Sequence, residues 1–462
     1  MTMVKKLITL GLGTLILSVI GLYNGYPLVY SDTGTYIYSG FDKFIPFDRP
    51  ITYGLFLSFF SFHYSAWFVI IIQNLITAYV LYEALSLFFD KSNHFNKIYY
   101  AIIFFLVITT GIGWYSNQLM PDFFAPLTIL VFYILMQEKK IPFYTKAILS
   151  LILVYSLITH FSHLLIGTTL LIVLISLKVL LKHSFKQVSF RRLYFIAAIV
   201  FSSWFILPGI NYLTEKHFVL SKGSHVFLMA HLNDTGILEK FLKENCSDNE
   251  FKDCKICNYK DSLPTDLASF IWTSDILKNT GGWENSKDEY NKIITETLKR
   301  PKYLLLNIYR SVTYGFIQLT KNEIGQGLTA YNEGSAPYGQ IHWRFHDELN
   351  NYLNSRQNQW NGANLKFDFL NHVQLILLIF SILVVILLFT SPIRLKIDPN
   401  TLEFLIFVII SIVINSFITA GLNSPCERFQ ARVVWLLPFS IMILLIYNYK
   451  ILINLFTTQG HK

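Results

Sequence analysis

Long apolar runs, separated by short polar loops, dominate the pattern of hydrophobic and polar positions. A helix needs about 20 residues to cross a hydrocarbon core of about 30 Å, because each residue rises about 1.5 Å. The pattern therefore predicts an all-α polytopic membrane protein with about ten transmembrane helices. The predicted spans are residues 7–23, 64–88, 98–115, 120–137, 141–160, 161–181, 192–212, 370–390, 402–421 and 433–455.

The apolar runs divide the chain into three predicted parts. Residues 1–212 form an N-terminal membrane module of seven helices, and residues 370–462 form a C-terminal module of three. Between them, residues 213–369 are polar and mixed, which predicts a mainly helical extracytoplasmic domain inserted before the last three helices. Within this domain, the stretch from Tyr303 to Leu319 is apolar enough to lie on the membrane.

Lysine and arginine gather in alternate loops, which predicts the orientation of the bundle. If the N-terminus is cytoplasmic, the basic clusters fall inside; they are Lys5 and Lys6, Lys91 and Lys97, Lys139 and Lys140, residues 178–192, Arg394 and Lys396, and Lys450 and Lys462. The last short external loop breaks this pattern, since it holds Arg428 and Arg432. Because arginines there disfavour the topology, we expect them to have a function.

The first apolar run resembles a signal peptide, because Met1–Lys6 is basic and Leu7–Leu22 is apolar. No small-residue cleavage site follows, so an uncleaved first helix is predicted.

Composition agrees with a membrane protein. Hydrophobic residues make up 53% of the chain and charged residues 15%, whereas soluble domains carry about 25% charged residues. The net charge of +9 does not predict nucleic-acid binding, because the basic residues lie mostly in short loops between apolar runs.

Four cysteines, Cys246, Cys254, Cys257 and Cys426, all fall on the predicted external side, where disulfides persist. We predict a bridge between Cys246 and Cys257, which would close a loop of about ten residues. A bridge between Cys254 and Cys426 is a second candidate. The Cys-x-x-Cys at 254–257 is also compatible with a redox or metal site, although no second cysteine pair accompanies it.

Charged and polar residues gather in the predicted external loops and predict a site there. A carboxylate can take a proton from an attacking hydroxyl, and arginines can hold a phosphate bidentately. Helices can form a groove for a lipid tail, so these groups suit transfer from a lipid-linked phosphate donor. The candidate catalytic residues are Asp32 and Asp122, and the candidate substrate-binding residues are Tyr36, Arg49, His160, His163, Arg428 and Arg432.

This arrangement resembles the GT-C superfamily of polyprenyl-phosphate-sugar-dependent glycosyltransferases. Asp32 and Tyr36 match the acidic motif of the first external loop, which carries the catalytic carboxylate in that family. The other matching stretches are Asp48-Arg49-Pro50 with Tyr53-Gly54, Asn117 to Asp122, and Glu427-Arg428 with Arg432. Thr33 stands where many members have a second acid.

The resemblance implies a GT-C-like fold in the cytoplasmic (inner) membrane of a bacterium, with an extracytoplasmic active site. It implies a glycosyltransferase whose partners are a polyprenyl-phosphate-linked sugar donor and membrane lipid. No cofactor is identified, and a divalent metal stays open.

Structural interpretations remain open beside the catalytic one. Asp32 and Asp122 would each suit the cap of a short helix. His160 and His163 would suit an interfacial turn, and the two late arginines would suit ion pairs with Glu427 or with the external domain. A cluster at His342–Glu348 contains residue types that bind metals but is typical of a solvated face.

Two other functions are compatible with the sequence. One is a transporter or flippase for a lipid-linked glycan, although transporters often show inverted repeats and broken helices near the midplane. The other is a non-catalytic envelope assembly protein whose external domain carries the function.

Overall fold

The protein is described by a computed structural model, which covers residues 3–89, 93–137, 141–180, 189–359 and 365–453. In those residues the regular elements are helices, and Leu28 and Gln118 form an isolated β-bridge. Seven of the described helices are long and apolar enough to cross a membrane, as expected of a helical membrane protein. They are α1 (Met3–Asn24), α4 (Ala66–Leu85), α9 (Phe161–Leu180), α10 (Phe190–Glu215), α19 (Asp368–Thr390), α20 (Pro399–Leu422) and the run Glu427–Tyr447, which comprises α21 (Glu427–Val434) and α22 (Leu436–Tyr447).

Three of the ten predicted spans are shorter helices, so the number ten stays a prediction. They are α5 (Asn93–Thr109), α7 (Phe124–Met136) and α8 (Phe143–Ile158). The helix α5 ends six residues before the predicted boundary, and the chain resumes as α6 (Ile112–Ser116). A short 3-10 turn, η1 (Pro121–Phe123), precedes α7 and carries Asp122.

The helix α7 forms the centre of the bundle. All 13 of its residues are buried, and it contacts α4, α8, α9, α10, α20 and α21. A helix that is apolar on every side is buried among other helices. Its apolar run therefore reflects packing against protein on all sides, and the sequence alone does not distinguish this from contact with lipid.

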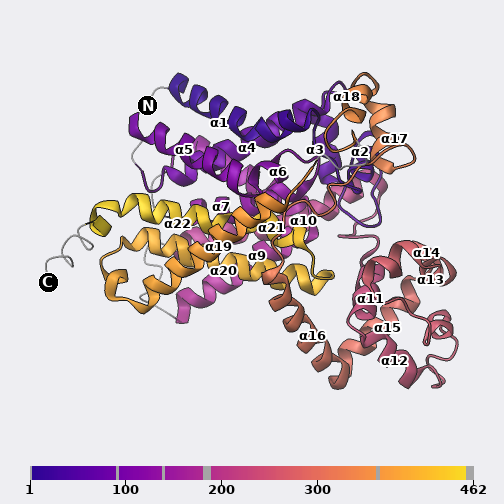
Figure 1. The fold of residues 1–462 in the computed structure, drawn as a ribbon. Helices are drawn as coiled ribbons and strands as arrows, with labels where there is room; N and C mark the ends of the chain where they lie inside the picture. The colour runs from indigo at the N-terminus through magenta and orange to yellow at the C-terminus, as the bar shows by residue number, and fades with distance from the viewer. Residues whose placement is uncertain (1–2, 90–92, 138–140, 181–188, 360–364, 454–462) are drawn as a thin grey trace.

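Two short helices, α2 (Thr33–Asp42) and α3 (Thr52–Phe60), cross at one end of the bundle. We call this the site end, because it also holds the start of α21 (Figure 1). The crossing depends on two glycines: a Cβ added to Gly40 would lie 1.9 Å from the carbonyl oxygen of Gly54. This contact fixes α2, which directly follows Asp32, against α3.

The segment 213–369 contains two differently packed parts. The first is a lobe, residues 224–300, with its own buried apolar core. Its elements are α11 (Ser224–Asp234), α12 (Ile237–Asn245), η2 (Lys255–Tyr259), the π-helical turn η3 (Ser269–Thr273), α13 (Ile276–Asn279), α14 (Gly282–Asn285) and α15 (Lys287–Lys299).

The predicted disulfide is confirmed, since Cys246 and Cys257 are bonded in the lobe. The second candidate bridge is wrong, because Cys254 and Cys426 are both free. Cys254 packs against the lobe core, whereas Cys426 precedes α21 at the site end.

The second part is residues 321–359, which we call the cap segment. It follows α16 (Pro301–Thr320) and contains α17 (Ala336–Arg344), η4 (His346–Glu348) and α18 (Leu349–Leu353). Figure 1 shows α17 and α18 beside α2 and α3, outside the lobe. The carboxylate of Glu348 accepts hydrogen bonds from the Tyr26 hydroxyl at 2.8 Å, the Ser65 hydroxyl and the Ala66 amide at 3.2 Å. The cap segment is thus anchored at the start of α4.

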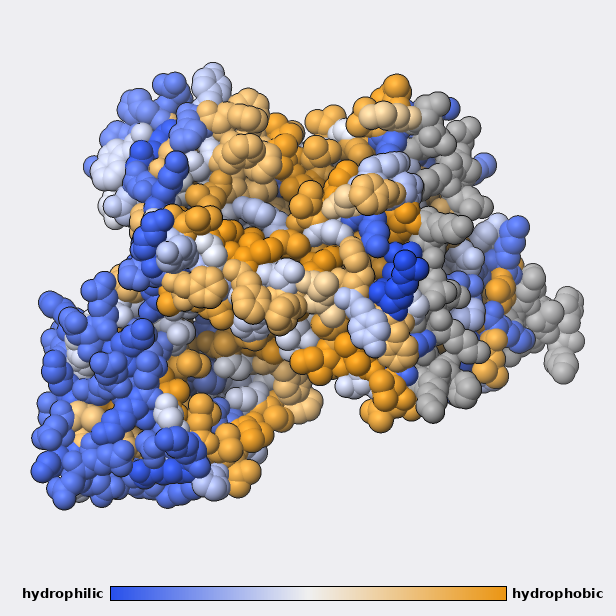
Figure 2. Space-filling view, turned by 180° about the vertical axis from the view of Figure 1, so that it is seen from behind, coloured by the Kyte–Doolittle hydropathy of each residue, from blue (hydrophilic) through white to orange (hydrophobic). Residues whose placement is uncertain are grey.

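Figure 2 shows how polarity divides the surface. Hydrophilic residues cover the lobe and gather at the same end of the molecule, while hydrophobic residues form a broad band over the bundle. An apolar band of this kind is what helices in contact with lipid present.

Substitution Gly40→Ala should destabilise the protein by about 1–3 kcal/mol, because the new methyl group overlaps the backbone of α3. Unfolding temperature in detergent is the measurement. The matched control is Gly11→Ala in α1, since a Cβ there meets nothing within 4 Å and alanine favours a helix by up to about 1 kcal/mol. Equal stability of the two variants would contradict the close crossing.

Candidate functional site

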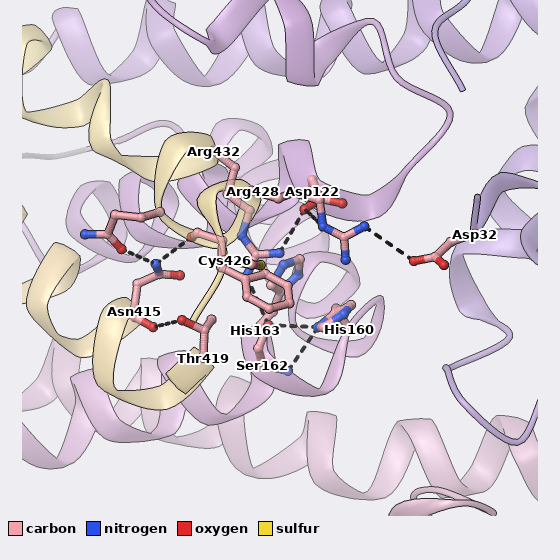
Figure 3. Close-up of polar contacts among 12 residues, drawn as sticks. Asp32, Asp122, His160, Ser162, His163, Asn415, Thr419, Cys426, Arg428 and Arg432 are labelled. Carbon is pink, nitrogen blue, oxygen red and sulfur yellow. Dashed lines mark hydrogen bonds and ion pairs between the residues drawn. The ribbon is translucent and has the colours of Figure 1, made fainter. Parts of the chain in front are cut away.

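Five charged side chains form a network of alternating sign at the site end. Figure 3 shows Asp32, Asp122, Arg428 and Arg432, and the fifth member is Arg49. Arg49 Nη2 lies 3.1 Å from Asp32 Oδ1, and Asp32 Oδ2 lies 3.4 Å from Arg428 Nη1. Arg428 Nε lies 3.7 Å from Asp122 Oδ1, and the same oxygen accepts a hydrogen bond from Arg432 Nη1 at 3.1 Å. We call these five residues the ion-pair network. It joins the first loop, η1 and α21.

Asp32 precedes α2, yet its carboxylate makes no capping hydrogen bond. The carboxylate instead contacts Arg49 and Arg428, and the Asp32 backbone carbonyl accepts from Arg49 Nη1 at 3.2 Å. Burial alone would raise the pKa of Asp32, but the two guanidiniums outweigh it and hold the pKa below its ordinary value. Asp32 is therefore ionised at neutral pH.

Arg49 is held from two further sides. Its Nε donates to Asp48 Oδ2 at 2.9 Å, and its guanidinium carbon lies 5.0 Å from the centre of the Tyr36 ring. The Tyr36 ring is 2% exposed and packs edge-on against Tyr53 at 5.0 Å. Tyr36 thus supports Arg49 from inside the protein and is not placed to contact a substrate.

Arg428 and Arg432 lie one helical turn apart on α21, so both side chains leave the same face of the helix. The guanidinium of Arg428 lies 4.4 Å from the centre of the Tyr30 ring. Arg432 Nη2 donates to the Ser162 hydroxyl at 3.2 Å. Glu427 pairs instead with Lys321 at 3.1 Å, so the arginines find their acidic partners in Asp32 and Asp122.

His160 and His163 border the network where α8 turns into α9, with ring centres 5.2 Å apart. Burial and the guanidiniums of Arg432, Arg428 and Arg49 lower the pKa of His160 well below its ordinary value, so this ring is neutral at neutral pH. His163 Nδ1 lies 3.1 Å from the Ser156 carbonyl, which assigns the proton to Nδ1. His163 Nε2 is then a buried acceptor without a partner in the structure, and Arg432 Nε is a buried donor without one.

Exposure separates the members of the network. The Asp32 side chain is 26% exposed, Arg428 11% and Arg49 10%, whereas Asp122 is 2% and Arg432 0% exposed. An incoming group would therefore meet Asp32, Arg428 and Arg49 first. Asp122 and Arg432 are more deeply buried, and Asp122 pairs with Arg428 from that side.

Sequence reasoning missed three neighbours of the network. Tyr30 and Ser162 have ordinary residue types, and no pattern singles them out. Gln326 of the cap segment accepts a hydrogen bond from the backbone amide of Arg428 at 2.9 Å. Beside it, a Cβ on Gly327 would lie 1.8 Å from the Tyr30 ring. The Gly-Gln-Gly at 325–327 is the one local signal of this close approach.

Other candidates lie elsewhere. Asp42 pairs with Arg344 of α17 at the far end of α2. His342 and His346 stack at 5.2 Å, away from the network.

The donor set does not fit a divalent metal as arranged. No group of three or more histidine, cysteine, aspartate or glutamate residues in the described part of the chain could hold a metal ion. The carboxylates of Asp32 and Asp122 face guanidiniums instead.

No family model, no curated protein and no solved structure matches this chain. The resemblance to the GT-C superfamily accordingly stays a prediction.

Substitution Asp122→Asn should destabilise the fold by about 3–5 kcal/mol, because it removes the carboxylate that faces a fully buried Arg432. Chemical or thermal unfolding in detergent measures the loss. The matched control is the double variant Asp122→Leu with Arg432→Met, which removes both charges and should recover much of the stability. A double variant no more stable than Asp122→Asn would contradict the pairing.

Asp32 should contribute to the pH dependence of stability. Because folding lowers its pKa, the ionised carboxylate contributes stability that is fully present above its unfolded pKa of about 3.9 and is lost as the pH falls through the lower folded pKa. Asp32→Asn should therefore lose less stability than the wild type between about pH 6 and pH 2. Parallel unfolding-temperature profiles for the two proteins would show that Asp32 is not held by the arginines.

Proposed function

We propose that this protein transfers a sugar from a lipid-phosphate-linked donor to an acceptor at the site end of the bundle. The observation that supports this most is the ion-pair network: its partly exposed face presents one carboxylate between two guanidiniums, next to helices suited to a membrane. Carboxylate and guanidinium groups are the two kinds that such a transfer needs, one for the acceptor proton and the other for the phosphate.

Binding of the donor would change the state of Asp32. A phosphate competes with a carboxylate for the same guanidinium fork, so a phosphate held by Arg428 and Arg49 draws them away from Asp32. The pKa of Asp32 then rises, because the neighbouring positive charges that lowered it are neutralised. A carboxylate that is a weak base in the free protein thereby becomes a stronger base when the donor is present.

The chemical step follows from this arrangement. Asp32 takes the proton of the acceptor hydroxyl, and the acceptor oxygen attacks the anomeric carbon of the sugar. The bond between that carbon and the phosphate oxygen breaks, and its electron pair goes to the phosphate. Arg428 and Arg49 stabilise the charge that develops on the departing lipid phosphate. Asp122 keeps Arg428 in place, and Arg432 holds Asp122.

The position of the network bears on the alternative functions. Transporter sites typically lie near the bilayer midplane, where broken helices meet. The ion-pair network lies at one end of the bundle, which favours transfer over transport. An envelope assembly protein would not need Asp32, and the experiment below separates it from an enzyme.

Substitution Asp32→Asn should remove at least about a hundredfold of transfer activity, because the amide cannot accept the acceptor proton. Arg428→Ala should weaken use of the donor. The assay follows release of polyprenyl phosphate from polyprenyl-phosphate sugars in proteoliposomes supplied with a membrane extract as the source of acceptor.

The matched control is Asp42→Asn, because Asp42 lies on α2 but pairs with Arg344 outside the network. All variants are compared at equal folded amounts, judged by unfolding temperature. If Asp32→Asn folds and retains nearly normal function, the catalytic role is wrong and the assembly protein becomes the better hypothesis.

A further inference from the structure

The helix α16 carries an apolar stripe that the described part of the chain leaves open. The stripe follows helical spacing over the length of the helix, and its side chains are 41–66% exposed; they are Leu305, Ile308, Tyr309, Val312 and Phe316. Residues at this spacing share one face of an α-helix. Large contiguous apolar patches are rare on surfaces that face water, so this face is expected to have an occupant.

The protein holds α16 at both ends, which fixes the direction of the stripe. Near the start, the buried Tyr303 belongs to the lobe core, and its hydroxyl accepts from Asn245 Nδ2 at 2.8 Å. Near the end, Gly315 packs against Phe417 of α20, and the Ser416 hydroxyl donates to the Gly315 carbonyl at 2.6 Å. The helix therefore cannot turn its stripe inward without breaking both contacts.

We infer that this stripe lies in the lipid bilayer surface at the site end, with its side chains among the acyl chains just below the headgroups. Two observations favour lipid as the occupant. The C-terminal half of α16 packs directly on α20, a candidate span, so the stripe is continuous with a surface already expected to meet lipid. Figure 1 also shows α16 slanting from the bundle to the lobe, so that its length extends beyond the side of the bundle. Amphipathic helices of this kind lie in the plane of the interface.

This placement would link the bilayer to the arginine helix. The Gln318 side chain of α16 accepts from the Cys426 amide at 2.9 Å and donates to the Cys426 carbonyl at 2.8 Å. Lys321, directly after α16, pairs with Glu427 in the first turn of α21. If α16 lies in the membrane interface, its contacts with α21 fix the depth of α21, and therefore of Arg428, relative to the membrane surface. This inference holds whether or not the protein is a glycosyltransferase.

The test uses the full chain in lipid nanodiscs, with Cys254→Ser and Cys426→Ser as background so that the disulfide remains. Single cysteines at Leu305, Val312 or Phe316 carry a nitroxide, and the matched control is Arg310, which is exposed on another face of the same helix. Collision rates are measured with oxygen, which concentrates in the bilayer, and with a nickel chelate, which stays in water. We expect oxygen collisions to exceed nickel collisions at the stripe positions and to fall below them at Arg310.

Two results would overturn the inference. Nickel collisions at Leu305 and Phe316 as frequent as at Arg310 would place the stripe in water. Protection of these positions from both reagents would mean that protein covers it, either a second copy of the chain or another partner. Because the labelled side chains are exposed, the variants should fold normally, and a monodisperse nanodisc sample confirms this.

Discussion

The buried charge of Arg432 is the constraint on which the site end depends. A guanidinium enclosed in an apolar bundle is strongly destabilising unless a carboxylate faces it. Asp122 supplies the carboxylate from η1, and Ser162 supplies an acceptor from the start of α9. The same aspartate lies beside Arg428, which in turn reaches Asp32. The need to neutralise the buried charge of Arg432 thus brings together segments that lie hundreds of residues apart in the sequence.

The surrounding scaffold limits how this network can move. The glycine crossing fixes α2, which directly follows Asp32, against α3, and Glu348 anchors the cap segment at the start of α4. The buried Tyr36 ring packs against the guanidinium of Arg49, and the Tyr30 ring packs against that of Arg428. Charged groups held in this way are oriented before any ligand arrives, which is how preorganised sites stabilise developing charge.

Several parts of this arrangement follow from the sequence, for identifiable reasons. The exception of Arg428 and Arg432 to the loop-charge rule singles them out in the sequence. The structure pairs Arg428 with Asp32 and Asp122, and Arg432 with Asp122. Helix positions follow from apolar runs, but a run such as 120–137 has the same pattern whether it faces lipid or protein. The structure makes α7 short and fully buried, which hydropathy alone does not predict.

Other parts were beyond the sequence because they depend on contacts between distant residues. The Gly-Gln-Gly at 325–327 indicates a close approach of the backbone, but it does not identify Arg428 as the partner of Gln326. Nor does the sequence indicate that Glu348 accepts from the Ala66 amide at the start of α4. Likewise, the sequence predicts that Asp122 is catalytic, whereas the structure buries its side chain beside Arg428 and Arg432. Whether a side chain can contact a ligand depends on how deeply the fold buries it, and residue type and spacing do not predict that burial.

The central claim is that the partly exposed face of the ion-pair network receives a lipid-linked phosphate. A cryo-electron microscopy map of the full chain in nanodiscs with a polyprenyl phosphate tests it most directly. The account predicts phosphate density between Arg428 and Arg49, with the Asp32 carboxylate displaced from both and the lipid tail running along the bundle. Density for the phosphate at another place, with Arg49, Asp32 and Arg428 still paired as in the free protein, would contradict it.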